Sequence, residues 1–174
     1  MQKIVVVPYN PQWPLKFQAE KSLIEGAVKD NLVALYHIGS TSVPKLKAKP
    51  IIDMLLIVED INKLDEESLV FEKMDYEVMG EFGISGRRYY RKGGNHRSHQ
   101  IHAFQFDQLY DIQRHLAFRD YLRAHDNVAQ EYGELKETLA LLYPESIADY
   151  GDGKDAFVKQ TEKAALIWEW QNRE

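Results

Sequence analysis

The side chains best suited to chemistry lie in residues 37–58, HIGSTSVPKLKAKPIIDMLLIV. Gly39 and Ser40 end an apolar run and begin a turn, and free backbone N–H groups at such a turn bind phosphate readily. Thr41 adds a hydroxyl group, and Lys49 adds a positive charge a few residues later. The same turn could do no more than cap a helix, so these residues alone leave a phosphate site and a structural turn open.

Asp53 lies in the middle of the apolar run IIDMLLIV, which predicts a buried strand. An ionised carboxylate that is buried without a partner is strongly unfavourable, so Asp53 needs a cation or an opening to solvent. Strand alternation puts Asp53 and Leu55 on one face and Met54 on the other. Three interpretations stay open, namely a metal ligand, a strand face in contact with water, and an ion pair with Lys45, Lys47 or Lys49.

Histidines in the later segment SHQIHAFQFD, residues 98–107, could complete a metal site with Asp53. Strand alternation lets only one of His99 and His102 point into the same cleft. We predict His102 as the metal ligand and keep His99 as a secondary candidate, together with His37 beside the Gly-Ser turn. One carboxylate with one or two imidazoles suits Mn²⁺, Fe²⁺ or Zn²⁺ better than Mg²⁺. A half-buried histidine bonded to the backbone is the alternative for His102.

A basic segment, RRYYRKGGNHR at residues 87–97, contains five Lys or Arg residues and no acid. Arg88 and Arg91 could clamp phosphate groups, while Tyr89 and Tyr90 offer rings on which a base could stack. A hairpin edge with ordinary solvated charges is an equally consistent alternative. We therefore keep Arg88 and Arg91 as phosphate-binding candidates.

The elements that must position these residues form an α+β arrangement over residues 1–109. Apolar and β-branched runs bounded by Gly, Pro or Asn predict strands, and apolar residues at helical spacing predict helices. A hydroxyl side chain is expected to cap a brief helical turn at 40–46. The expected helices are residues 12–30 and 61–74, and the expected strands are residues 3–10, 31–39, 50–58, 76–83, 87–92 and 98–106.

Residues 110–174 are expected to be helical, because apolar side chains recur there at intervals of three and four residues. Pro144, Gly151 and Gly153 are expected to separate the last two helices. Asp152 or Asp155 would then cap the final helix.

Arg114 and His115 stand at the start of this helical part. Neighbouring residues point about 100° apart on a helix, so we expect only one of them to face a cleft. We predict Arg114 as a secondary site candidate.

The overall composition limits the class of protein. A length of 174 residues fits a single domain, 1–174, in which the helical part packs on the α+β core. The net charge of −5 argues against broad nucleic-acid binding, and the absence of cysteine excludes disulfides, thiolate metal sites and a cysteine nucleophile. No apolar run reaches the roughly 18 residues of a membrane span, and the apolar N-terminal run is too short for a signal peptide. We expect a cytoplasmic protein without a membrane partner, whose apolar helical stripes form a core or a homodimer face.

The spacing of the motifs resembles a known fold family. Gly39-Ser40, followed after twelve residues by Asp53, resembles the nucleotidyltransferase superfamily. The runs HIGSTSVP and AKPIID, with RHLAFRDYLRAH at 114–125, are similar to the GrpB family of nucleotidyltransferase-fold proteins. The resemblance implies a mixed β-sheet with flanking helices, a nucleotide or nucleotide-containing ligand, and a divalent metal, Mg²⁺, Mn²⁺ or Zn²⁺. A related domain is joined to dephospho-coenzyme A kinases, which adds a coenzyme to the candidate ligands.

Leu55 departs from the superfamily pattern, because the second carboxylate of the usual pair would stand at this position. Two-metal transfer relies on carboxylates that bridge ions about 3.5–4 Å apart. Two functions therefore stay open. One is metal-dependent nucleotidyl transfer with Asp53 as the catalytic residue, and the other is nucleotide or coenzyme binding by a fold that has lost catalysis.

Overall fold

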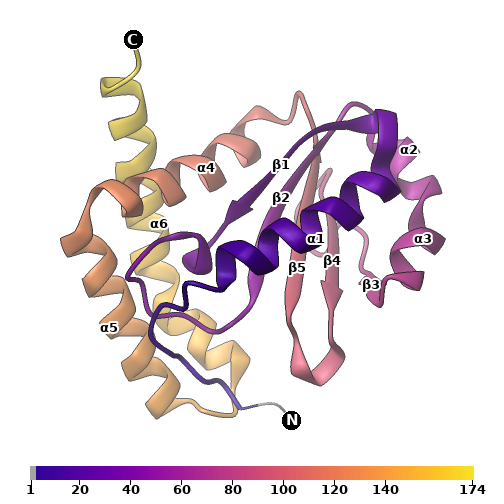
Figure 1. Ribbon diagram of the computed structural model, residues 1–174. Helices are drawn as coiled ribbons and strands as arrows, with labels where there is room; N and C mark the ends of the chain where they lie inside the picture. Colours follow the sequence, from indigo (N-terminus) through magenta and orange to yellow (C-terminus); the bar gives the residue numbers. More distant parts are fainter. Residues whose placement is uncertain (1–2) are drawn as a thin grey trace.

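The computed structural model describes residues 3–174 and contains a five-stranded mixed sheet (Figure 1). The strands lie in the order β1-β2-β5-β4-β3, with β2 and β5 parallel and the other neighbours antiparallel. This arrangement confirms the expected α+β class. The strands are β1 (Leu32–Ile38), β2 (Ile52–Val58), β3 (Tyr76–Val78), β4 (Arg88–Lys92) and β5 (His99–Gln105).

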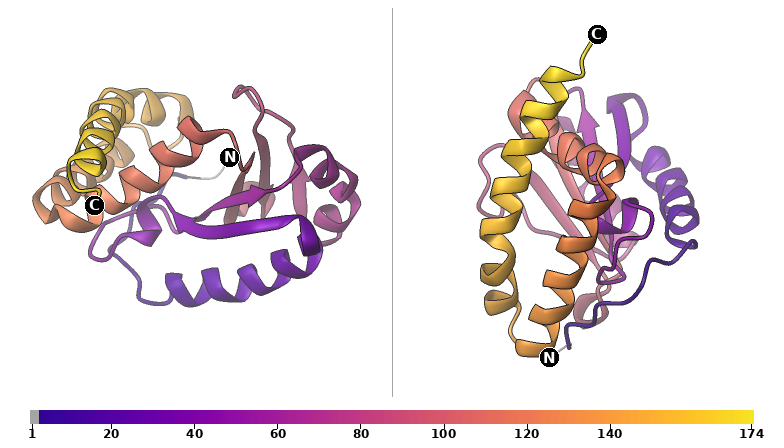
Figure 2. Two further views of the ribbon diagram at one scale, coloured as in Figure 1. Left: turned by 90° about the horizontal axis from the view of Figure 1, so that it is seen from above. Right: turned by 90° about the vertical axis from the view of Figure 1, so that its left-hand side faces the viewer.

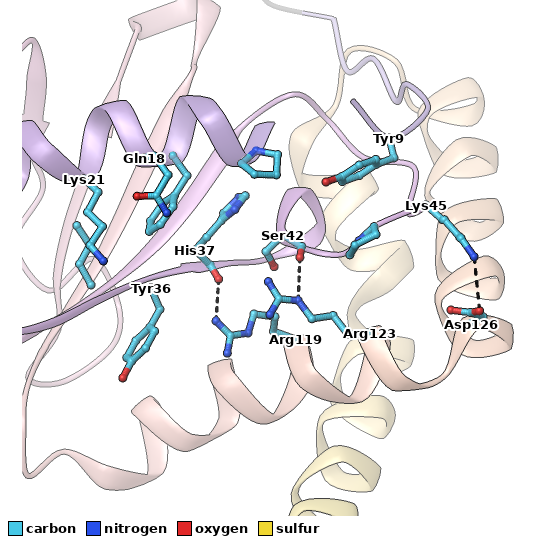
Figure 3. A pocket seen from close by; sticks show the side chains of 14 residues that line it. Tyr9, Gln18, Lys21, Tyr36, His37, Ser42, Lys45, Arg119, Arg123 and Asp126 are labelled. Atoms are coloured by element: carbon cyan, nitrogen blue, oxygen red, sulfur yellow. Dashed lines mark hydrogen bonds and ion pairs between the residues drawn. The ribbon is translucent and has the colours of Figure 1, made fainter. Parts of the chain in front are cut away.

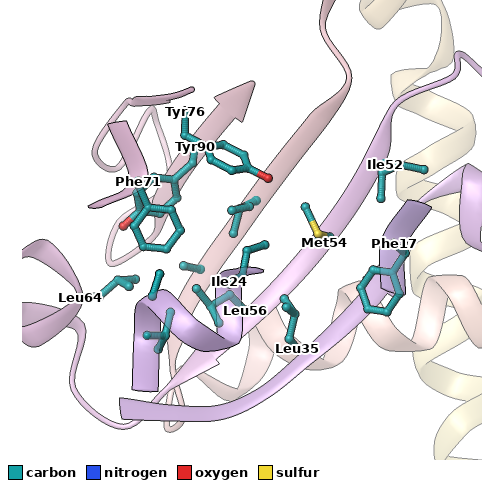
Figure 4. Close-up of a cluster of buried hydrophobic side chains, with 14 of the residues drawn as sticks. Phe17, Ile24, Leu35, Ile52, Met54, Leu56, Leu64, Phe71, Tyr76 and Tyr90 are labelled. Atoms are coloured by element: carbon teal, nitrogen blue, oxygen red, sulfur yellow. The ribbon is translucent and has the colours of Figure 1, made fainter. Parts of the chain in front are cut away.

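One face of the sheet is covered by helix α1, Trp13–Val28 (Figure 2). Met54 and Leu56 of β2 share a buried apolar cluster there with Phe17 and Ile24 of α1 (Figure 4). The same cluster reaches two short helices beside β3, α2 (Ile61–Glu66) and α3 (Ser68–Lys73), which replace the single helix expected at 61–74. This face of the sheet is therefore the larger part of the apolar core.

The opposite face carries Asp53 and Leu55, as strand alternation predicts, and it packs against the helical third of the chain. Leu55 is fully buried in a cluster with Phe104 of β5 and Ile112 of α4. Three helices make up this part, namely α4 (Leu109–Ala124), α5 (Asp126–Leu142) and α6 (Ile147–Gln171). Figure 2 shows them on the side of the sheet away from α1. None of the helices in residues 3–174 combines the length and the apolar character that a membrane crossing requires.

Two expected strands are wrong in whole or in part. At residues 3–10, Val7 forms an isolated bridge with Ala48 instead of belonging to a strand, because Pro8 lacks the N–H group that a ladder needs. The strand expected at 76–83 ends at Val78, since Gly80 has a φ of +64°, which an extended strand does not contain.

Two expected helix ends are also wrong. The 3₁₀ turn Ser40–Ser42 is preceded by Gly39, and no hydroxyl side chain caps it. Helix α6 begins before Gly151 and Gly153, because the Ser146 side chain accepts a hydrogen bond of 3.2 Å from the Asp149 N–H and caps the helix there. Asp152 and Asp155 therefore lie inside the helix and do not cap it.

Candidate functional site

Gly39 brings the turn after β1 against the carboxylate of Asp53. Its φ is +71°, and a Cβ atom at this position would lie 2.8 Å from Asp53 Oδ2, so the close approach requires glycine. Ile38 and Asp53 are partners in the β1–β2 ladder, which fixes this register. The Gly-Ser turn and Asp53 are therefore neighbours in the fold.

Three lysines from separate parts of the chain converge on this turn. Lys49 precedes β2, Lys136 belongs to α5, and Lys154 belongs to α6. Together with Ser40 and Asp53 they line a hollow of about 110 Å³, which we call the lysine hollow. The hollow joins the α+β part of the chain to its helical third.

Lys136 is the most deeply buried of the three lysines, with 2% of its surface exposed. Its Nζ donates a 2.7 Å hydrogen bond to Ser40 Oγ and lies 4.4 Å from the centroid of the Tyr132 ring. Burial, followed by repulsion from the other two lysines, lowers the pKa of Lys136 well below its ordinary value.

Lys49 and Lys154 both approach the Tyr150 ring, since their Nζ atoms lie 5.0 and 5.3 Å from its centroid. Burial, and then the charge of Lys154, lowers the pKa of Lys49 to about 8. Burial also lowers the pKa of Lys154, against the attraction of Asp53. Aromatic faces attract cations but carry no net charge, so these contacts do not neutralise the lysines.

The lysine hollow therefore has more positive than negative charge. Asp53 supplies the single carboxylate among its lining residues, and none of the three lysines forms a salt bridge with any residue in 3–174. Buried charges are normally paired, because desolvation of an uncompensated ion is costly. Buried ammonium groups without counter-ions indicate a place for an anion.

A second hollow of about 220 Å³, the histidine hollow, shares Ser40, Asp53 and Lys154 with the first. Its further lining includes two histidines, an arginine and two aromatic side chains. These residues are His102, His115, Arg114, Phe118 and Tyr132. The two hollows are thus parts of one depression around Asp53.

His102 lies beside Asp53, with 3.5 Å between its Nε2 atom and Asp53 Oδ1. On the other side of the ring, Arg87 Nη1 lies 3.4 Å from His102 Nδ1 and donates to it. Arginine is only a donor, so Nδ1 accepts and the ring proton is on Nε2. His102 therefore directs an N–H group at Asp53, where a metal ligand would present a lone pair.

The residues around Asp53 do not fit a two-metal centre. Asp53 Oδ1 is buried and makes no hydrogen bond, so it could accept one further partner. Leu55, at the position of the second carboxylate, is enclosed by apolar side chains under α4. Across residues 3–174, no three His, Cys, Asp or Glu side chains are grouped as a metal site would require. A metal ion held by Asp53 and His102 stays a prediction, limited to a single ion.

Arg114 and His115 both line the histidine hollow, so the prediction that only one would face a cleft is wrong. The histidine hollow extends far enough along α4 to be lined by two consecutive residues of the helix. Arg114 is neutralised by Asp111 at 3.0 Å and by Glu162 at 3.7 Å. Burial, and then the proximity of His102, lowers the pKa of His115 to about 3, so this histidine is neutral.

Thr41 lines the lysine hollow, but its hydroxyl group is engaged inside the protein. It donates to the carbonyl oxygen of Ile51 at 3.1 Å and accepts from His37 Nε2 at 2.9 Å. The His37 ring stacks on Phe17 of α1 at a centroid distance of 5.0 Å. His37 therefore lines neither hollow around Asp53.

Three other predicted residues are not brought to Asp53. His99 lies on the α1 face, 3.8 Å from Glu20 Oε2. Arg88 shares that face and forms a bidentate salt bridge with Asp65 at 2.7 and 3.0 Å. Arg91 points to the Asp53 face, yet it is paired with an acid on β3 at 3.4 Å and lines neither hollow. Both predicted phosphate-binding arginines are thus paired with acids.

Sequence inspection missed Lys136 and Lys154. Lys136 comes four residues after Tyr132 and three before Leu139, so it shares the apolar stripe of its helix. A lysine on a core-facing stripe is a usable signal of a buried charge. Lys154 was missed because the final helix was predicted to begin too late, so that Lys154 fell in the segment between two helices.

A comparison with protein families identifies the chain. The model of the GrpB protein family matches residues 3–164. The chain belongs to the GrpB family. It is 43% identical over 167 residues to YqkA of Bacillus subtilis, covering 96% of this chain and 48% of YqkA, so it spans about half the length of that relative. It is also 30% identical over 165 residues to the glutamate-rich protein GrpB of Alkalihalophilus pseudofirmus, covering 91% of this chain and 93% of that protein.

Solved structures agree with this assignment to the GrpB family. The crystal structure of GrpB from Enterococcus faecalis is 51% identical and has a TM-score of 0.93, covering 95% of this chain and 99% of that one. The Cid1 poly(U) polymerase bound to MgATP is 11% identical and has a TM-score of 0.50, covering 85% of this chain and 50% of the polymerase. The second likeness shows a nucleotidyltransferase-like fold and nothing further, which confirms the expected fold.

Proposed function

We propose that the lysine hollow of this GrpB family member binds the phosphate groups of a nucleotide or a nucleotide-containing molecule. The observation that carries the proposal is the convergence of Lys49, Lys136 and Lys154 on Ser40, with Asp53 as the one carboxylate among them. Lysine binds phosphate as a compact point charge, and its strength grows when water is excluded. A phosphate group would supply the counter-charge that the protein itself lacks.

The charge and size of the lysine hollow favour a compact, multiply charged anion. Three lysines against one aspartate leave two positive charges when all four groups are ionised. A volume of about 110 Å³ suits a phosphate group better than an extended ligand. The Ser40 hydroxyl group, which already accepts from Lys136, adds a neutral donor to the same place.

The histidine hollow would hold the remainder of such a ligand. It is continuous with the lysine hollow through Ser40, Asp53 and Lys154, and Phe118 and Tyr132 give it aromatic walls. Flat rings of this kind suit a sugar or a base attached to the phosphate. The MgATP in the Cid1 structure makes ATP the first nucleotide to test.

Metal-dependent nucleotidyl transfer is the second candidate function. The buried Asp53 Oδ1 atom, which makes no hydrogen bond, favours it because such an atom could bind one divalent cation. His102 could join it only if its ring turned a lone pair toward the ion. Leu55 weighs against it, since two-metal catalysis needs a second carboxylate. Phosphate binding is therefore the better supported of the two.

Thermal unfolding with and without ligand tests the proposal. ATP, dephospho-coenzyme A and pyrophosphate are each added in EDTA, in Mg²⁺ and in Mn²⁺. A ligand at 100 times its dissociation constant stabilises the folded state by about 2.7 kcal/mol, which is easily measured. We expect at least one of the three compounds to stabilise the protein in EDTA, since the lysines can neutralise phosphate without a metal.

Two variants of the same helix provide the matched control. Lys154→Met should weaken binding at least tenfold, whereas Lys159→Met should leave it unchanged, because Lys159 is exposed and pairs with Asp155 at 2.9 Å. Stabilisation by none of the three compounds would overturn the proposal. Binding that requires Mn²⁺ or Mg²⁺ and disappears in Asp53→Asn would favour the second candidate instead.

A further inference from the structure

A larger hollow lies at the edge of the sheet, separate from the two hollows around Asp53 (Figure 3). It measures about 610 Å³ and lies between α1, the edge strand β1 and α4. We call it the β1 groove, and its principal residues are Phe17, Tyr36, His37, Arg119 and Arg123. No lining residue is shared with the lysine or histidine hollow. Its volume falls in the range of roughly 300–1,000 Å³ that is usual for small-molecule sites.

Helix α4 gives the β1 groove two arginines one helical turn apart. Arg119 Nη1 donates to the carbonyl oxygen of His37 at 3.1 Å, and Arg123 Nε donates to the carbonyl oxygen of Ser42 at 2.9 Å (Figure 3). Arg119 also pairs with Asp120 at 2.9 Å, whereas Arg123 forms no salt bridge with any residue the structure describes. The backbone therefore fixes both guanidinium groups without removing their charge.

Aromatic side chains supply the apolar part of the β1 groove. Tyr36 is 39% exposed, and the guanidinium carbon of Arg119 lies 5.8 Å from the centroid of its ring. On the α1 side, the rings of Phe17 and His37 stack at an interplanar angle of 10°. An exposed ring next to a guanidinium group is a platform for a flat ligand that carries a negative charge.

His37 adds no charge to the β1 groove. Burial is the main cause that lowers the pKa of His37 to about 4, so the ring is neutral at physiological pH. The Thr41 hydroxyl group donates to Ile51 O, so it accepts the proton of His37 Nε2, and Nδ1 is left as an acceptor. Lys21 and Lys45 also line the groove, but each lies 3.9 Å from an acid, Glu25 and Asp126 respectively, so the unbalanced positive charge is on α4.

We propose that the β1 groove binds a small aromatic anion, with its ring against Tyr36 and its carboxylate, sulfonate or phosphate group on Arg119 and Arg123. The lining calls for both halves of this ligand. The exposed ring of Tyr36 needs a flat apolar body, and Arg123, which has no acidic partner in residues 3–174, needs a negative group that Arg119 can also contact. The proposal is independent of the lysine hollow, because the two hollows share no residue.

Fluorescence titration with 8-anilinonaphthalene-1-sulfonate, an aromatic sulfonate, tests the proposal on the full chain. We expect one bound probe per chain. The double variant Arg119→Gln/Arg123→Gln should weaken binding at least tenfold, and Arg173→Gln, two residues beyond the end of α6, should not change it. The uncharged analogue N-phenyl-1-naphthylamine should bind at least tenfold more weakly than the sulfonate to the unaltered protein.

A second variant separates binding from folding, because the two arginines also hold the backbone around the Gly-Ser turn. Tyr36→Ser removes the exposed ring without touching these hydrogen bonds and should weaken probe binding about fivefold or more, as loss of roughly 1 kcal/mol of aromatic contact implies. Unchanged affinity in both variants would overturn the proposal. Loss of probe binding in Lys154→Met would also overturn it, because the probe would then bind in the lysine hollow. Displacement of the probe by a polyglutamate peptide, at a concentration below that of the probe, would indicate a protein partner and would overturn it too.

Discussion

Two buried polar clusters lie on opposite faces of the sheet, and they treat charge in opposite ways. On the α1 face, Glu20 is 6% exposed and its carboxylate accepts from Tyr76 Oη at 2.7 Å and from Lys92 Nζ at 3.0 Å. His99 Nε2 lies 3.8 Å from the same carboxylate. On the Asp53 face, three lysines surround one aspartate and form no salt bridge with residues 3–174.

The difference between the two clusters shows how buried charged residues that stabilise the fold can be distinguished from those that bind a ligand. The Glu20 cluster is complete, since each charged group has a partner within the protein, and its expected role is stability. The lysine hollow is incomplete, and it also encloses a volume of about 110 Å³. Burial alone does not distinguish the two clusters, but charge balance does.

Removal of Glu20 should produce the largest change in stability. Glu20→Gln leaves Lys92 without its counter-charge and weakens the acceptor of Tyr76, so the free energy of unfolding in urea should fall by about 3 kcal/mol. Glu137→Gln is the control, because Glu137 forms an exposed salt bridge with Lys47 at 3.0 Å. A loss for Glu20→Gln as small as that of the control would contradict the view that this cluster is structural.

A substitution in the Gly-Ser turn should produce the next largest change in stability. Gly39→Ala combines a positive φ with a Cβ atom 2.8 Å from Asp53 Oδ2, and it should destabilise the protein by about 2 kcal/mol. Gly26 in α1 is the matched position, because a Cβ atom there meets nothing within 4 Å, and Gly26→Ala should stabilise by up to about 1 kcal/mol. Chemical denaturation of both variants measures the difference. Equal stability of the two variants would show that the turn tolerates a side chain.

The pH dependence of ATP binding sharpens the comparison further. In the ligand-free protein the pKa of Lys49 is about 8, and a bound phosphate would raise it. The affinity for ATP should therefore be highest well below pH 8, where Lys49 is charged, and should fall as the pH rises through that value. Calorimetric titration should show that the affinity for ATP falls about tenfold between pH 7 and pH 9. Lys49→Met should flatten the profile, and a flat profile in the unaltered protein would exclude Lys49 from the contact.

The smallest expected effect has the opposite sign. Without ligand, Lys136→Met removes a buried amino group that burial already disfavours in its charged form and that has no counter-ion, so the free energy of unfolding should rise by about 1 kcal/mol. The same variant should bind ATP more weakly. A clear loss of stability, comparable to that of Glu20→Gln, would mean that the protein already compensates the charge of Lys136.

The sequence by itself determined most of the strands and the faces of β2 and β5. Alternation placed Asp53 with Leu55 and separated His99 from His102, because a strand has a period of two residues whatever surrounds it. Alternation depends on local geometry, which a single segment carries. The meeting of Gly39-Ser40 with Asp53 involves two strands, and the sequence predicted it only through a resemblance in spacing.

Only the tertiary structure decided which charges remain unbalanced. Arg88 and Arg91 had the composition of a phosphate clamp, but Asp65 and Glu77 neutralise them after folding. Lys136 and Lys154 lie on helices far along the chain, and they reach Asp53 because α5 and α6 pack on that side of the sheet. Charge balance is a sum over neighbours in space, so it cannot be read from spacing along the chain.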